Sequence, residues 1–266
     1  MDPAESRDRI MTVLFSRLAP LALFLLAAAP ALAEPCRSET YNDNDYIICS
    51  FDLTRTDLRL YWRKADGSPF GTFDALADRL KSAGDVLQFA INGGMYDENY
   101  RPIGLYVEAG KELSRAKTAN APSGAKPVPN FFKKPNGVFY FGTTGAGVAT
   151  TEAFLATRPQ ADFATQSGPM LVIDGKVHPA FIPGSSDRKP RDGVGTSSPT
   201  TVHFAISEGS VTFYEFALLF RDRLGCRSAL FLDGGSAPGL YAPELDRNDP
   251  PGHGGYGPIV AAVGKG

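Results

Sequence analysis

The apolar segments of this 266-residue chain are short, and their length limits what it can fold into. VLQFAI, GVFYFG and SALFL either end at glycine or are followed directly by asparagine or aspartate. Short apolar runs bounded by turn residues are typical of strands. The 28 glycines and 21 prolines allow the many turns that such strands require. The sequence therefore predicts a domain of many short strands.

A few helices are expected between these strands. Thr72 precedes the amphipathic segment FDALADRLKSAG, residues 213–224 place apolar side chains on one face, and TEAFLATRP is a shorter candidate. GPMLVIDGKV predicts a hairpin with an Asp-Gly turn. Neither a repeat nor a change of composition divides residues 34–266. We expect a single α+β domain whose mixed, largely antiparallel sheet core is flanked by a few helices.

The first 33 residues have the features of a secretory signal peptide. Arg7, Arg9 and Arg17 precede an apolar run from Leu18 to Ala33, which ends in a small-x-small site. The run is shorter than the roughly 20 residues of a membrane span and contains two prolines, which disfavours the alternative of an uncleaved anchor. We expect residues 1–33 to be removed, and residues 34–266 to be periplasmic or secreted, with no stable membrane insertion after cleavage.

Three cysteines lie in the exported part of the chain. Cys36 and Cys49 flank a short polar stretch that is typical of a hairpin tip, so we expect a disulfide between them. Cys226 lies between a predicted helix and a predicted strand, and we expect a buried free thiol.

The charge balance and the missing motifs exclude several classes of function. A net charge of −2 gives no electrostatic basis for binding a nucleic acid. The spacing of cysteine, histidine and acidic residues matches no metal-site motif, and no glycine-rich nucleotide motif occurs. We expect no metal and no cofactor.

Two apolar strands end in a polar residue followed by paired glycines, at INGG (91–94) and LDGG (232–235). Strand ends are where α/β sheets place ligands, and glycine lets the backbone approach them. The alternative is that Asn-Gly and Asp-Gly simply make turns. With QSGP (166–169), the two motifs predict a pocket. Its candidate substrate-binding residues are Gly93, Gly94, Gln166, Ser167, Gly168, Gly234, Gly235 and Ser236.

Asp233 is the strongest candidate for a catalytic acid or base, because a buried strand end can raise the pKa of a carboxyl group. Glu215 is a possible second carboxyl group, although it can instead complement the dipole of the late helix. Arg191 falls in a stretch, 181–198, that we predict to be a polar loop. There it can bind an anionic group of the substrate or remain a solvated loop charge.

The order of these segments resembles the phosphodiester glycosidase family. The resemblance rests on INGGMY, PIGLYVEAGK, KPNGVFYF, TQSGPMLVIDGKV, RDGVG and LGCRSALFLDGGSAPGLYAPE, which follow one another over most of residues 34–266. It implies hydrolysis of the bond between an anomeric carbon and a phosphodiester oxygen, in a small molecule or an envelope glycan. It also implies functional positions at Asn92, Arg191 and Asp233. Where many relatives have DGGGS, this chain has DGGSA.

Two alternatives remain open on the sequence alone. One is an envelope module of the same fold that binds a carbohydrate or sugar phosphate without catalysis. The other is a plain phosphodiesterase, which would cleave the phosphorus–oxygen bond instead.

Overall fold

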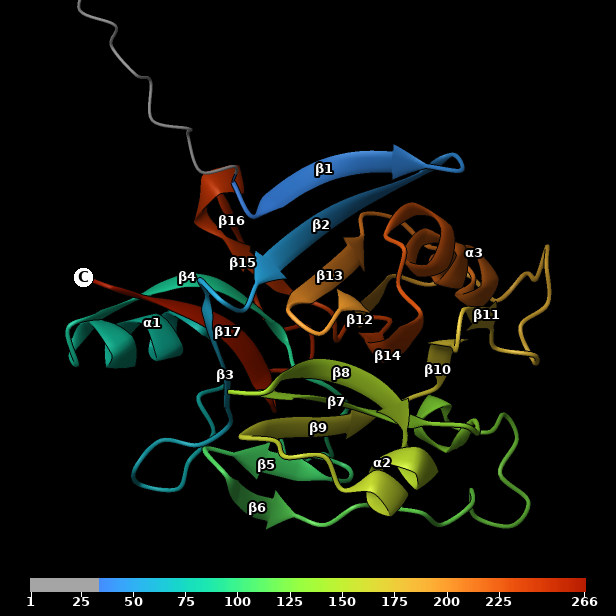
Figure 1. Cartoon of the computed structure of the whole chain (residues 1–266), viewed down its shortest axis with the longest axis horizontal. Coiled ribbons are helices and arrows are strands. Elements are labelled where there is room, and N and C mark those ends of the chain that lie inside the picture. Colours follow the sequence, from blue (N-terminus) through green and yellow to red (C-terminus); the bar gives the residue numbers. More distant parts are fainter. Residues whose placement is uncertain (1–33) are drawn as a thin grey trace, which may run out of the picture. The chain divides into compact units, whose positions relative to one another are not determined.

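Residues 34–266 are described by a computed structural model with three antiparallel sheets (Figure 1). The predicted signal peptide, residues 1–33, lies outside the described residues. The sheets and a small number of helices confirm the expected α+β domain. Among residues 34–266, no helix has the length and apolar character needed to cross a membrane.

The first sheet has seven strands in the order β1-β2-β13-β12-β14-β10-β11. They are β1 (Cys36–Tyr41), β2 (Asn44–Asp52), β13 (Thr201–Ser207), β12 (Arg191–Ser198), β14 (Ser228–Gly234), β10 (Met170–Ile173) and β11 (Lys176–Val177). The Asp-Gly hairpin is confirmed between β10 and β11, where Asp174 and Gly175 both have positive φ.

The second and third sheets have five strands each, in the orders β16-β15-β4-β17-β3 and β6-β5-β9-β7-β8. The second contains β16 (Arg247–Asn248), β15 (Leu240–Ala242), β4 (Asp85–Asn92), β17 (Ile259–Lys265) and β3 (Asp57–Tyr61). The third contains β6 (Lys111–Ser114), β5 (Tyr106–Glu108), β9 (Phe163–Ser167), β7 (Gly137–Gly142) and β8 (Gly145–Thr150).

One aromatic cluster joins the three sheets. Phe204 of the first sheet lies 5.3 Å from Phe89 of the second and 5.8 Å from Phe139 of the third, measured between ring centroids. Phe51 completes the cluster at 4.7 Å from Phe89. All four side chains are buried. The three sheets are therefore held in fixed relation by one shared core.

The helices form where the capping residues predict. Thr72 accepts a hydrogen bond from the backbone N–H of Ala75 and begins α1 (Phe73–Lys81), whose buried face packs on the second sheet. The other helices are α2 (Thr151–Thr157), α3 (Phe213–Leu218) with its π-helical continuation η2 (Leu219–Arg223), and the 3₁₀ turns η1 (Asn130–Phe132) and η3 (Pro243–Leu245). α3 and η2 cover one face of the first sheet.

The prediction of a polar loop over residues 181–198 is wrong for residues 191–198. Residues 191–198 form β12, which lies inside the first sheet between β13 and β14. The segment RDGVGTSS lacks the apolar alternation of a strand because two of its positions are glycine. A Cβ atom at Gly193 would lie 3.1 Å from the ring of Phe216, and one at Gly195 would lie 2.8 Å from Phe220. The helical layer packs so closely on β12 that these positions leave no room for apolar side chains.

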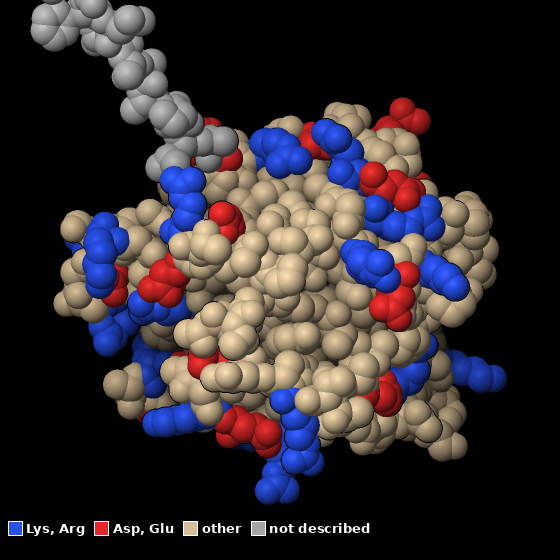
Figure 2. Space-filling model, viewed as in Figure 1, with Lys and Arg blue, Asp and Glu red and all other residues tan. Residues whose placement is uncertain are grey.

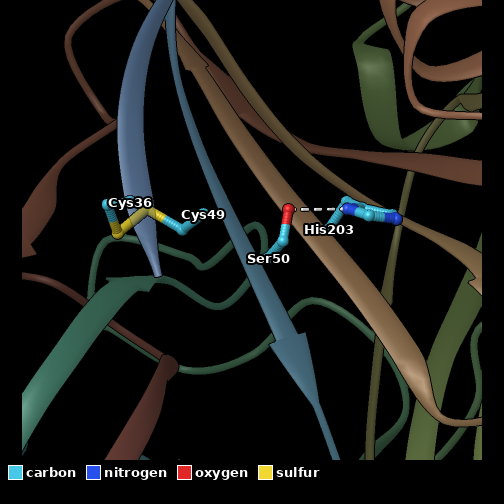
Figure 3. Close-up of a disulfide and its surroundings, with 4 residues drawn as sticks. All are labelled: Cys36, Cys49, Ser50 and His203. Carbon is cyan, nitrogen blue, oxygen red and sulfur yellow. Dashed lines mark hydrogen bonds between the residues drawn. A yellow bond between two sulfur atoms is a disulfide. The ribbon is translucent and has the colours of Figure 1, made fainter. Parts of the chain in front are cut away.

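The disulfide between Cys36 and Cys49 is confirmed, and it joins the directly opposed residues of β1 and β2 (Figure 3). On the next strand, His203 is held by hydrogen bonds of 2.8 Å to the hydroxyl groups of Ser50 and Ser197. Cys226 is a buried free thiol, as predicted, and burial raises its pKa to about 12.

Charges of both signs are interspersed on the face of the molecule seen in Figure 2, in keeping with the near-neutral balance of the whole chain.

Candidate functional site

Strand ends from all three sheets meet at the candidate site. Asn92 ends β4 of the second sheet, Asp233 lies next to the end of β14 in the first, and Ser167 ends β9 of the third. The Ser167 hydroxyl donates a 2.6 Å hydrogen bond to the carbonyl of Leu232. Close by, the Thr165 hydroxyl of β9 donates to a backbone carbonyl of the INGG turn at 2.7 Å. The structure thus brings together the predicted INGG, QSGP and LDGG motifs.

A β-bulge turns Asp233 toward Asp192. In the pairing of β12 with β14, Asp192 lies opposite Asp233 and Gly193 lies opposite Phe231, so Leu232 is an extra residue on β14. Directly opposed residues share one face of a sheet. The Asp233 N–H donates a 2.7 Å hydrogen bond to Oδ1 of Asp192. Bulges of this kind occur next to active sites, where they redirect a side chain.

The environment of Asp233 makes it a group that titrates near neutral pH. Burial raises its pKa from an ordinary value of 3.8 to about 7. The 2.8 Å hydrogen bond from the N–H of Gly234 opposes this shift, and so does the nearby amide side chain of Asn92. The residue as a whole is partly buried. A carboxyl group with this pKa can both accept and donate a proton at physiological pH.

Asp192 is a site residue that sequence reasoning missed. Its side chain is completely buried, and its pKa is raised well above the ordinary range by burial and by the neighbouring carboxyl group of Asp233. Its Oδ2 atom has no hydrogen-bond partner among the described residues. The available signal was its position in RDGVG beside Arg191, but the predicted loop concealed its burial in a strand.

Asn92 is also completely buried. The oxygen of its side-chain amide bonds to the INGG turn, and the nitrogen lies near Asp233. Oδ1 accepts a hydrogen bond from the N–H of Gly94 at 3.2 Å. Nδ2 has no partner with hydrogen-bond geometry in residues 34–266, although it lies near enough to Asp233 to lower the pKa of that residue. Buried polar atoms are almost always paired. Nδ2 of Asn92 and Oδ2 of Asp192 are therefore two exceptions, and both lie beside Asp233.

Close packing or a positive φ accounts for glycine at the predicted substrate-binding positions. A Cβ atom at Gly93 would lie 3.0 Å from the backbone of Pro258, and one at Gly234 would lie 2.9 Å from the ring of Phe231. Gly94 and Gly235 have positive φ, and Gly168 packs against Asn136. The N–H groups of Gly93, Gly94, Gly234 and Gly235 all donate within the protein.

Gln166 is fixed by four hydrogen bonds and connects the third sheet to the following loops. Its Oε1 accepts from the N–H groups of Leu105 and Lys117, and its Nε2 donates to Lys117 O and to the Thr151 hydroxyl. Both acceptor sites of Oε1 and both N–H donors of Nε2 are used within the protein, so the Gln166 amide has none left to bind a ligand.

Arg191 does not face Asp233. It adjoins Asp192 in β12, and successive strand residues point to opposite faces. Its guanidinium lies 3.6 Å from the ring centroid of Phe213, and it donates to the carbonyl groups of Val211 and Asp187. Burial lowers its pKa to about 10, and Asp187 opposes this shift. The side chain is 1% exposed, so these contacts occupy the group that was predicted to bind the substrate anion.

Glu215 has the structural role that the sequence left open. It forms a capping box with Thr212 at the start of α3 and accepts hydrogen bonds of 2.7 and 2.9 Å from Arg188. Burial raises its pKa, but the bonds from Thr212 and Arg188 outweigh burial and lower it overall. The carboxyl group that the structure brings to Asp233 is that of Asp192.

A small cavity lies beside Tyr96, and Asn92, Asp192 and Asp233 are not among its lining residues. It has a volume of about 250 Å³ and is lined by Tyr96, Asp97, Glu98, Tyr100 and His253. Burial and the charges of Asp233 and Asp192 raise the pKa of Tyr96. Ser236, which follows LDGG, is exposed, and its hydroxyl lies 2.9 Å from Nε2 of His253.

Within residues 34–266, histidine, cysteine and acidic side chains form no cluster of three that could hold a metal ion.

The raised pKa of Asp233 predicts how folding stability depends on pH. Between about pH 4 and pH 7 the folded protein retains a proton on Asp233 that the unfolded chain releases, so stability falls as the pH rises through this window. We expect Asp233→Asn to be more stable than wild type at pH 8 by on the order of 2 kcal/mol, and nearly equal at pH 4. Urea unfolding at both pH values measures this difference. The same pH dependence in both proteins would contradict the assignment.

Comparisons with known proteins agree with this architecture. The sequence profile of the phosphodiester glycosidase family matches residues 85–264. The uncharacterized protein YigE of Escherichia coli (strain K12) is 36% identical over 216 residues, covering 80% of this chain and 81% of YigE.

Solved structures share the fold at low sequence identity. The zebrafish N-acetylglucosamine-1-phosphodiester alpha-N-acetylglucosaminidase catalytic domain matches with a TM-score of 0.56 and 13% identity, over 85% of this chain and 81% of that one. A hypothetical protein from Synechocystis matches with a TM-score of 0.51 and 13% identity, over 86% and 61%. A putative exported protein from Burkholderia pseudomallei matches with 0.50 and 12%, over 82% and 74%.

Proposed function

Because the chain belongs to the phosphodiester glycosidase family, we propose that it is a hydrolase that cleaves the glycosyl bond of a sugar-1-phosphodiester. The observation that carries the proposal is the pair formed by Asp233 and Asp192 where the three sheets meet. The family supplies the reaction class, and this pair supplies a carboxyl group that exchanges protons near neutral pH.

In the proposed reaction Asp233 acts as the general base. Its ionised carboxylate accepts a proton from water while the water oxygen forms a bond to the anomeric carbon. The bond between that carbon and the phosphodiester oxygen breaks, and its electron pair leaves with the phosphate. The products are a free sugar and a phosphomonoester.

The neighbouring residues are proposed to orient the reacting groups. Nδ2 of Asn92 is free to donate a hydrogen bond to a substrate oxygen beside Asp233. Asp192 is a positioning residue, because it accepts the Asp233 N–H and fixes the bulge. Arg191 is proposed to support the site from the opposite face of β12, because its guanidinium is bonded to backbone carbonyl groups.

The cavity beside Tyr96 is the proposed position of the sugar. Its tyrosine and acidic side chains offer an apolar ring surface and hydrogen-bond acceptors, a combination that suits a carbohydrate. The exposed pair of Ser236 and His253 borders this cavity and is proposed to contact the phosphate. The glycine N–H groups are left out of this proposal because they donate within the protein.

Isotope labelling tests the proposed reaction. The purified protein is incubated with N-acetylglucosamine-1-phosphodiesters and other glycosyl-1-phosphodiesters in oxygen-18 water, and both products are analysed by mass spectrometry. We expect the label in the sugar. Label in the phosphate would instead identify a plain phosphodiesterase, and saturable binding with no product would identify a non-catalytic sugar-phosphate module.

We also propose that the domain is exported to the periplasm or secreted. The disulfide between Cys36 and Cys49 supports this, because disulfides persist in oxidising compartments. The signal-like sequence at residues 1–33 and the fold shared with a putative exported protein are consistent with it. Fractionation of expressing cells tests it, and a full-length cytosolic protein with reduced cysteines would contradict it.

A further inference from the structure

A larger, mostly apolar cavity lies away from Asp233. Its volume is ≈ 460 Å³, within the usual range for a small-molecule site. Its walls come from residues 128–134 around η1, from residues 178–187 after β11, and from the start of α3. Asn92, Asp192 and Asp233 are not among its lining residues.

Stacked aromatic rings form a continuous wall of this cavity. His178 lies 4.7 Å from Phe181, and Phe181 lies 4.9 Å from Phe213, with the rings nearly parallel in both pairs. His178 is a neutral part of this wall, because burial lowers its pKa and both ring nitrogens are bonded to the backbone. At the rim, Ile182 is 69% exposed and Val128 is 40% exposed. The apolar surface therefore continues from the wall to the opening.

The cavity also contains a cation without an acceptor. The Lys133 ammonium lies 5.0 Å from the ring centroid of Phe213, while the Arg191 guanidinium lies 3.6 Å from the same ring. Lys133 is half-buried, and within residues 34–266 it has no side-chain hydrogen bond or ion pair. Three cations, Lys133, Lys189 and Arg191, are close enough to interact with the single carboxylate of Asp187. Lys133 and Asp187 line the cavity, whereas Lys189 and Arg191 lie behind its lining.

We propose that this cavity binds one molecule of an alkyl phosphate, with the alkyl chain against the aromatic wall and the phosphate at Lys133. The apolar wall and rim account for the chain. Lys133 supplies a partly desolvated cation for a charge-assisted hydrogen bond to the phosphate. The proposal does not depend on the hydrolysis proposed above, because the two sites share no lining residue.

Calorimetric titration with dodecyl phosphate, below its micelle concentration, tests this site. We expect saturable binding of one molecule, with the Kd raised tenfold or more by Lys133→Met, which removes the cation and keeps an unbranched chain. Ile182→Asp is expected to raise the Kd by a similar factor, and it changes an exposed position that does not support the fold. Lys176→Met, on exposed β11 outside the cavity, is the matched control and should leave the Kd unchanged.

Three further titrations distinguish this cavity from the site at Asp233 and from binding by charge or by the alkyl chain alone. Asp233→Asn should bind dodecyl phosphate with the wild-type Kd. Binding at the cavity is then tested independently of whether the protein hydrolyses a glycosyl phosphodiester. Inorganic phosphate and dodecyltrimethylammonium should both bind at least tenfold more weakly than dodecyl phosphate. The proposal is overturned if either of them binds equally well, if neither cavity variant weakens binding, or if dodecyl phosphate does not bind.

Discussion

Asp233→Asn is expected to lower kcat/KM for a glycosyl phosphodiester by about 10²–10⁴-fold, the usual contribution of a general acid or base. Asparagine has the same shape as aspartate and can keep the hydrogen bond that Gly234 donates to Oδ1. It cannot accept the proton from the attacking water. The rate is measured with the substrate that oxygen-18 labelling identifies.

The control for this change is Asp174→Asn, in the exposed turn between β10 and β11. Asparagine tolerates the positive φ of that position, so the variant should keep wild-type turnover. Because Asp233→Asn is also expected to be the more stable protein at pH 8, a loss of activity cannot be attributed to unfolding. An Asp233→Asn protein within threefold of wild-type activity would exclude Asp233 as the base.

Removing the disulfide is expected to lower the free energy of unfolding by about 3 kcal/mol. Cys36 and Cys49 are 13 residues apart, and a bridge that closes a loop of this length restricts the unfolded chain by roughly that amount. Both cysteines are buried at the end of the hairpin formed by β1 and β2, so the double variant Cys36→Ala/Cys49→Ala also loses local packing. β1 is an edge strand, and it should be the first element to lose amide-exchange protection.

Cys226→Ala provides the comparison, because it removes a buried thiol and leaves the bridge intact. Denaturant unfolding of the two variants separates the effect of the bridge from that of losing a sulfur atom. A double variant within about 0.5 kcal/mol of wild type, the size expected for a surface substitution, would show that β1 is held by its ladder and side-chain packing alone.

Local signals predicted the elements whose determinants lie within a few residues of one another. Thr72 and the Asp174-Gly175 pair each fix a cap or a turn by their own backbone chemistry, and both are found as expected. β12 has no such signal. Its glycines are required by Phe216 and Phe220 of the helical layer, which are distant in sequence from β12. A contact of this kind cannot be read from the strand itself.

The same distinction applies to the candidate site. Asn92 and Asp233 could be singled out because each follows an apolar run and precedes paired glycines. Asp192 could not, because its burial depends on the register that places it opposite Asp233. Glu215 was ambiguous for the opposite reason, since its capping bond is local but Arg188, which holds its carboxylate, comes from a distant loop.

The pH dependence of kcat/KM tests the central claim most directly, because it reports the ionisation of the free enzyme. With Asp233 as the general base, kcat/KM should rise with pH through an apparent pKa of about 7 and then level off. The residual activity of Asp233→Asn should lack this step. A wild-type profile without a step near pH 7, or a step that persists in Asp233→Asn, would contradict the account.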